Sequence, residues 1–242
     1  MAYLWSLVDS SLGTLNLTTA NGYSVGKFNL GFPDPTVDET PRTEQSGTFD
    51  RTLWHGGRIV SLDIQVTGTA IQIRQRLAAL RAYGIQRARP EVRWDADGAY
   101  PEVIRAVGRM TFSGDVVTGM MQSVQLQCMV EKGTLQGVTQ RSVTIAAGAT
   151  ATVTTAGTDD VWPQYRCQAG TVDVTVNSLG RFVAASIPSV GTLDAYDMTF
   201  DFDQLVNYGL GNWTGLYLHA GANTVQNAGS GSLEVRWFDA WL

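Results

Sequence analysis

A chain of 242 residues is long enough to bury a core without disulfides or metals, and it has room for one or two domains. Charged residues make up only 16% of it, below the roughly 25% typical of globular domains, which favours extensive contact between subunits. The net charge of −5 argues against a nucleic-acid binder, because such proteins carry a basic patch or stripe.

Neither a membrane span nor an export signal is recognisable. No stretch approaches about 20 apolar residues, so we expect no membrane insertion. The first residues lack the basic and apolar regions of a signal peptide, so we expect synthesis in a cytoplasm. Cys128 and Cys167 are predicted to be buried small hydrophobic residues, and the sequence leaves their redox state open.

The first predicted elements are short strands. Leucines at 12, 15 and 17 indicate a hairpin that turns at Asn21-Gly22, a dipeptide typical of tight hairpins. The strand that follows is expected to point Val25 and Phe28 inward.

Phe32–Gly47 is a polar, proline-bearing segment that is long for an ordinary turn. Fixed φ angles at its prolines reduce the entropy lost when such a segment becomes ordered. We therefore predict an arm that reaches a neighbouring subunit, and the alternative is a disordered surface loop. The arm candidates are Phe32, Pro33, Pro35, Pro41 and Arg42.

One convincing helix is predicted over residues 70–84. It follows a strand in which Ile59, Leu62, Ile64 and Val66 are expected to alternate. Thr69 and Gln72 have the spacing of a capping box, and Gly84 is a natural stop. Ile73, Leu77 and Leu80 form the apolar stripe that faces the core.

A domain boundary is predicted between residues 134 and 135. A hairpin over Glu91–Arg105 and a strand ending at Val130 complete the first part, and Glu131–Gln140 is the candidate linker. Residues 1–134 hold 13 basic and 13 acidic side chains, whereas residues 135–242 hold 4 and 9. The second part carries only strand patterns, such as Val172, Val174 and Val176, which together suggest a β-sandwich.

Catalysis and metal binding have little support. The two histidines, His55 and His219, lie beside glycine-containing turns, and no Cys or His cluster has metal-ligand spacing. Asp95 and Asp97 resemble part of a calcium loop but lack its later ligands, so a solvated hairpin tip is favoured. We therefore expect that the protein is not an enzyme and that it binds neither a cofactor nor a metal ion. Trp213, among small polar residues, is a candidate for stacking on a glycan.

The last 80 or so residues carry a specific resemblance. Trp162-Pro163 opens a strand module, Gly221 and Asn223 form an apolar-x-x-G-x-N turn after Leu218, and the final strand ends in aromatics that include Trp237 and Trp241. This segment resembles the closing strands of the distal tail proteins of long-tailed bacteriophages. The first half resembles the ring-forming domain of the same family more loosely.

The resemblance implies a fold and a role. The fold is mostly β: residues 1–134 would form a split β-barrel-like, ring-forming domain with one helix, and residues 135–242 a galectin-like β-sandwich, or jelly roll. The role is that of a structural virion protein of the tail tip, assembled in the host cytoplasm. A homohexameric ring would join the tail tube protein to the hub or tail-associated protein and possibly contact the tape measure protein. The alternative is a carbohydrate-binding accessory module of a tail or cell-surface assembly.

Overall fold

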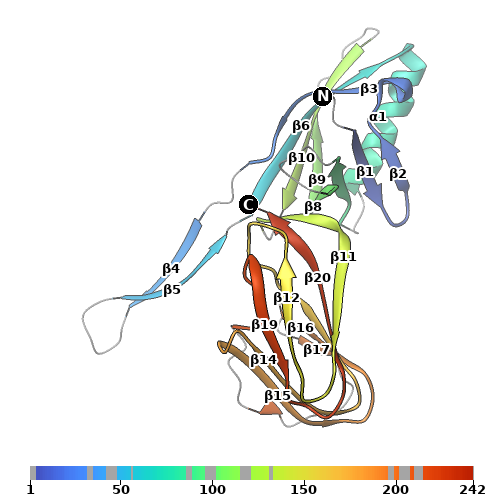
Figure 1. Cartoon of the computed structure of the whole chain (residues 1–242). Helices are drawn as coiled ribbons and strands as arrows, with labels where there is room; N and C mark the ends of the chain where they lie inside the picture. Colours follow the sequence, from blue (N-terminus) through green and yellow to red (C-terminus); the bar gives the residue numbers. More distant parts are fainter. Residues whose placement is uncertain are drawn as a thin grey trace. The chain divides into compact units, whose positions relative to one another are not determined.

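The computed structural model describes residues 4–31, 35–41, 48–55, 57–85, 89–95, 102–114, 121–130, 133–195, 199–201, 208–209 and 215–241. The chain divides into two compact units, Met1–Gln136 and Gly137–Trp241. Strands dominate the described residues of both units (Figure 1), which confirms the predicted mostly-β fold class.

The elements up to residue 130 are β1 (Trp5–Asp9), β2 (Gly13–Asn16), the 3-10 turn η1 (Thr19–Asn21), β3 (Tyr23–Asn29), β4 (Pro35–Pro41), β5 (Thr48–His55), β6 (Arg58–Thr67), α1 (Ala70–Ile85), β7 (Glu91–Trp94), β8 (Ile104–Val107), β9 (Arg109–Ser113) and β10 (Met121–Val130). The later elements are β11 (Leu135–Ile145), β12 (Thr150–Thr155), β13 (Gln164–Cys167), β14 (Gly170–Val176), β15 (Gly180–Ile187), β16 (Gly191–Asp194), β17 (Thr199–Asp201), β18 (Tyr208–Gly209), β19 (Gly221–Asn227) and β20 (Leu233–Trp241).

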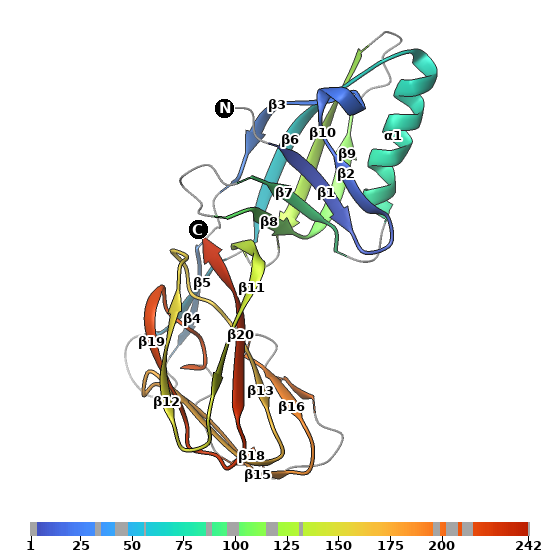
Figure 2. The ribbon, with the colours of Figure 1, turned by 45° about the vertical axis from the view of Figure 1, so that its right-hand side comes forward.

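The first unit combines two sheets with a helix. In its described part the strands run in the orders β2-β1-β7-β8 and β3-β6-β10-β9. Alternate residues of β6 and β10 are buried, so Leu62, Ile64 and Leu126 line the core while Gln125 and Gln127 face out. Helix α1 packs against β9 and β6 (Figure 2).

The predicted helix is confirmed together with its N-terminal cap. The backbone N–H of Thr69 donates to Gln72 Oε1 over 2.9 Å, and the N–H of Gln72 donates to Thr69 Oγ1 over 3.3 Å, which completes a capping box. The helix continues through Gly84 to Ile85, so it does not end at Gly84 as predicted. A Cβ at Gly84 would lie 3.0 Å from the Phe112 ring, which explains a glycine inside this helix.

The first hairpin differs from its prediction. Strand β2 pairs with β1, and the turn between them is held by Asp9, whose Oδ1 accepts the backbone N–H groups of Ser11 and Leu12 over 2.8 and 3.1 Å. Hydrogen bonds from Ser11 lower the pKa of Asp9. Asn21 ends the 3-10 turn, and Gly22, at φ +77°, closes it in the left-handed region, so the Asn21-Gly22 hairpin prediction is wrong.

Two side-chain orientations were also predicted wrongly. A register shift between Val25 and Lys27 interrupts the alternation of β3, which leaves Phe28 45% exposed. In β6 the inward residues include Arg58 and Val60, so Ile59 lies between them on the outward face and is 48% exposed. A one-residue change of phase turns a strand residue to the opposite face.

Strands β4 and β5 form an antiparallel two-stranded sheet of their own. Pro35 and Pro41 are the end residues of β4, paired in register with His55 and Thr48. Phe32, Pro33 and Arg42 lie outside the described residues. The predicted arm segment is therefore in part a strand of a hairpin rather than a single extended chain.

The second unit is a sandwich of two sheets. In its described residues the strand orders are β11-β20-β13-β16-β17 and β12-β19-β14-β15-β18. Its core lies between them and includes Tyr165, Val174, Phe182, Val225 and Val235. Leu135–Gln140 belongs to β11, and Leu135 is fully buried, so this part of the expected linker is strand instead.

Candidate functional site

An isolated antiparallel bridge brings together the sequence motifs of the second unit. The backbone N–H of Val161 donates to the Leu218 carbonyl, and that of Leu218 donates to the Val161 carbonyl, each over 2.8 Å. Both side chains are buried. Neighbouring residues in an extended chain point to opposite faces, so residues 160, 162, 217 and 219 share the face that Val161 and Leu218 do not occupy. On that face Asp160 opposes His219, and Trp162 opposes Tyr217.

These four side chains, Asp160, Trp162, Tyr217 and His219, are called the bridge patch below. The ring centroids of Trp162 and Tyr217 lie 5.1 Å apart at 47°, and those of Tyr217 and His219 lie 4.8 Å apart, edge to face. His219 Nδ1 lies 3.1 Å from Asp160 Oδ1. The side chains of His219 and Asp160 are 46% and 47% exposed, so the polar half of the patch is open to solvent.

Asn223 fixes the backbone of the patch. Its side chain is 1% exposed; its Oδ1 accepts the His219 N–H over 2.8 Å, and its Nδ2 donates to the carbonyls of His219 and Gly221 over 2.8 and 3.0 Å. Thr155 Oγ1 donates to the same His219 carbonyl and accepts the Gly221 N–H. Gly221 has φ +94°, a conformation that explains the glycine in this motif.

Trp162 and Pro163 join the patch to the core. Trp162 is partly buried against the core cluster, and Pro163 is buried. The Pro163 carbonyl accepts the backbone N–H of Ala195 over 3.1 Å. The motif residues Trp162, Pro163, Gly221 and Asn223 thus meet around one bridge.

The end of β20 holds the chain that leads into the patch. Asp239 Oδ1 accepts the Ala156 backbone N–H over 3.0 Å and Trp237 Nε1–H over 3.1 Å, while its Oδ2 lies 3.3 Å from Arg141 Nε. The Ala240 carbonyl accepts two further backbone N–H groups of this loop, from residues 158 and 159. Trp237 and Trp241 are 7% and 3% exposed, so these motif aromatics are packing residues.

Two polar side chains of this unit were not predicted. Asp239 is 1% exposed and Asn227 is 2% exposed. Asn227 Nδ2 donates to the carbonyls of Ile145, Ala146 and Gly231, so it ties the ends of two strands together. The sequence held a signal for both, because each falls on the inward phase of an alternating strand, where a polar residue needs partners.

The thiols offer no nucleophile. Cys128 and Cys167 are buried, as predicted, and both are free thiols; burial raises the pKa of each to about 12. Since the thiolate is the reactive form, both are inert near neutral pH. Among the described residues no group of three or more His, Cys, Asp or Glu side chains could hold a metal ion. Trp213, the glycan-stacking candidate, lies outside the described residues.

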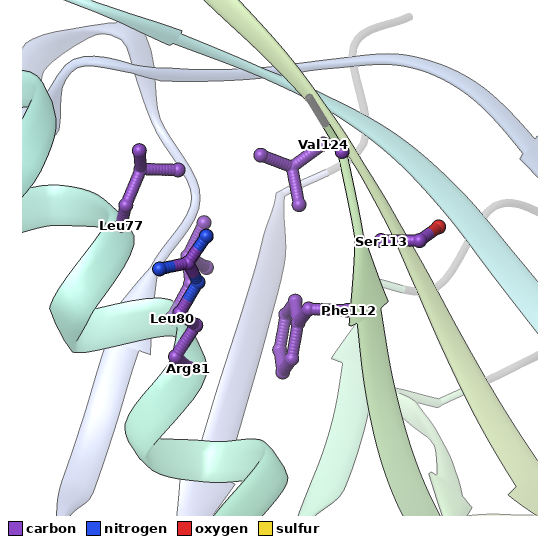
Figure 3. A pocket seen from close by; sticks show the side chains of 7 residues that line it. Leu77, Leu80, Arg81, Phe112, Ser113 and Val124 are labelled. Carbon is purple, nitrogen blue, oxygen red and sulfur yellow. The ribbon is translucent and has the colours of Figure 1, made fainter. Parts of the chain in front are cut away.

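A small cavity lies beside the helix of the first unit (Figure 3). It is lined mainly by apolar side chains from α1, β9 and β10, including Leu77, Leu80, Phe112 and Val124, with Arg81 at its side. Its volume of about 30 Å³ is enough for a water molecule. The cavity is far too small for an organic ligand.

Within the part of the chain that the structure describes, no helix has the length and apolar character needed to cross a membrane.

No protein-family model matches the chain, and no curated protein sequence does. Its fold, in contrast, matches solved structures. The Dit protein of phage SPP1, described as a paradigm of the hub adsorption apparatus in phages that infect Gram-positive bacteria, is similar with a TM-score of 0.66 and 12% identity, over 99% of this chain and 100% of that chain.

Two structures of the phage P2 baseplate in its activated conformation are also similar. The calcium form gives a TM-score of 0.52 at 8% identity, over 99% of this chain and 98% of that chain. The strontium form gives 0.51 at 7%, over 98% of each. The resemblance read from the sequence is therefore confirmed at the level of the fold: both units of this chain together have the fold of the SPP1 Dit protein.

Proposed function

We propose that this chain is a structural protein of a phage tail, located at the tail tip. The observation that carries the proposal is the extent of the fold similarity, which spans 99% of this chain and the whole SPP1 Dit protein. A match over two consecutive units is harder to reach by chance than a match to one common β-sandwich, because the order and pairing of both sets of strands must agree.

In this proposal the chain forms a homohexameric ring that joins the tail tube protein to the hub or tail-associated protein, and the tape measure protein is a further candidate partner. The first unit supplies the ring contacts, and the second is a galectin-like sandwich. Assembly takes place in the host cytoplasm before the virion is complete.

The outward face of β6 and β10 supports a role in assembly. Gln65, Ser123 and Gln125 lie on this face beside one carboxylate, Asp63, and Met129 stands opposite Ile59 in register. The two apolar side chains are 53% and 48% exposed. Uncharged and apolar side chains of this kind suit a subunit interface, whose core is depleted of charge.

The β4–β5 hairpin supports an intersubunit arm. A two-stranded ribbon is marginally stable by itself in water, so ribbons of this kind persist by packing on something else. In the described residues β4 and β5 pair only with each other. We propose that the hairpin packs on a neighbouring copy, with Pro35 and Pro41 at the ends of its first strand.

A structural role rather than an enzymatic one completes the proposal. The buried thiols, with pKa values of about 12, are poor nucleophiles, and the water-sized cavity beside α1 cannot hold a substrate. Both observations support, for the parts of the chain they concern, a protein that acts through its contacts.

Gold-labelled antibody against residues 137–241 tests the location in purified phage particles. We expect label at the end of the tail far from the capsid. Label along the tail shaft or on the capsid, or absence of the protein from particles, contradicts the proposal. A second antibody against the capsid shell is the control for particle integrity.

A further inference from the structure

We propose that the bridge patch, Asp160, Trp162, Tyr217 and His219, is a binding site for a neutral saccharide. The proposal does not depend on ring formation, because all four side chains belong to the second unit. It rests on three observations: a pair of partly exposed aromatic rings, a polar pair beside them, and a backbone that is fixed without a ligand.

The aromatic half of the patch suits the apolar face of a sugar ring. The C–H groups of a pyranose carry a small positive charge, and the face of an aromatic ring is the negative part of its quadrupole, so the two attract. Trp162 and Tyr217 lie 5.1 Å apart and are tilted by 47°, so their rings form a shallow corner rather than a closed stack. Both are partly exposed.

The polar half suits the hydroxyl groups at the rim of the same sugar. An ionised carboxylate only accepts hydrogen bonds, so we assign the His219 tautomer that carries its proton on Nδ1 and donates to Asp160 Oδ1 at the 3.1 Å contact. In a neutral imidazole with this tautomer, Nε2 is left as an acceptor. Asp160 Oδ2 and His219 Nε2 can then accept two hydroxyl protons, and hydrogen bonds to a carboxylate are among the stronger ones.

The fixed backbone reduces the entropy that binding would cost. Asn223 and Thr155 hold His219 through its N–H and carbonyl groups, and the double hydrogen bond of the bridge holds the chain beside Trp162. A group already in place loses little freedom when a ligand arrives. The Asp160–His219 contact is exposed to solvent, and exposed polar pairs of this kind add little to the stability of a fold.

Charge selects among saccharides. Asp160 faces solvent with 47% of its side chain exposed, so a carboxylate at the site repels uronic and sialic acids and favours neutral sugars. A shallow patch also leaves much of a ligand in water, so binding by one copy is expected to be weak and to gain strength when many copies act together.

Saturation-transfer NMR on the full chain tests the site with maltotriose, lactose and chitotriose, which offer similar apolar faces with different hydroxyl arrangements. We expect transfer to at least one of them. Tyr217→Ala is expected to weaken that binding by about tenfold, and Tyr217→Phe to retain it, because the ring is kept. Asp160→Asn is expected to weaken it as well, because the amide replaces a charged acceptor.

Asp173→Asn is the matched control, since Asp173 also makes an exposed cross-strand pair in this unit, with Arg181 at 2.7 Å. It is expected to bind like the unmodified chain. The thermal unfolding midpoint of each variant shows whether it is folded. No transfer to any of the three saccharides overturns the proposal, as does transfer that survives both Tyr217→Ala and Asp160→Asn, or a loss that Asp173→Asn reproduces. Ring formation is measured separately and is expected to be unaffected by Asp160→Asn.

Discussion

Polar side chains inside the second unit make hydrogen bonds that hydrophobic packing cannot replace. Asn223 and Asn227 lie on the inward phase of β19, and Asp239 on that of β20; each is 2% exposed or less. Their hydrogen bonds fix a turn, two strand ends and a loop. The sequence pattern marks such residues as inward, but it cannot name their partners, because Asn227 and Ile145 are 82 residues apart.

Replacement of Asn223 by alanine is predicted to destabilise the second unit by about 2–3 kcal/mol. The change removes a side chain that is 1% exposed, and with it the acceptor of the His219 N–H group and the donor to the carbonyls of His219 and Gly221. The measurement is urea unfolding followed by tryptophan fluorescence. Gln226→Ala is the control: this residue lies on the same strand but is exposed, and its effect is expected to stay within about 0.5 kcal/mol. An equal effect of the two substitutions would count against the assigned role of Asn223.

At the scale of elements, local signals gave good predictions and non-local pairing did not. Helix α1 was predictable because its cap, at Thr69 and Gln72, and its apolar stripe lie within a few turns. The β7–β8 hairpin was predictable for the same reason. The partner of β2 was not, because the Asp9 turn and the 3-10 turn at Thr19–Asn21 compete with a strong hairpin dipeptide.

The β4–β5 hairpin shows the same limit. Its strand β4 is polar and bears prolines at both ends, so its pattern resembled a loop, and only pairing with β5 reveals a strand. The strands that lead to the base of this hairpin are held together without it. Strands β3 and β6 are paired up to Asn29 and Ser61, and Gly31, at φ +64°, lies against the Ile59 backbone. Residues 35–55 can therefore be removed without separating β3 from β6.

Deleting residues 35–55 and joining the ends with a short glycine linker is predicted to leave a folded chain that assembles poorly. The β4–β5 sheet shares no strand with the two core sheets, so the unfolding free energy is expected to change by no more than about 0.5 kcal/mol. Size-exclusion chromatography with light scattering measures the assembly. Replacing only residues 42–47, which join the strands in sequence, with a short linker is the control. Full assembly of the deletion variant would refute the arm.

At the scale of the whole molecule, the sequence predicted more than its identity to known proteins would suggest. At 12% identity to SPP1 Dit, the turn motif with Gly221 and Asn223 and the opening Trp162-Pro163 still pointed to the fold. The structure explains why these residues stand out: each has a backbone or packing task around a single bridge. The strand order in each sheet was beyond prediction, because it depends on contacts between residues that are far apart in sequence.

We propose that copies of this chain form a ring at the tail tip, and electron microscopy of the purified chain is the sharpest test of that ring. Class averages of the projection images give the symmetry without any partner protein. We expect a six-fold ring with an open lumen. Particles that remain monomeric at the highest soluble concentration, or that close without a lumen, would contradict it.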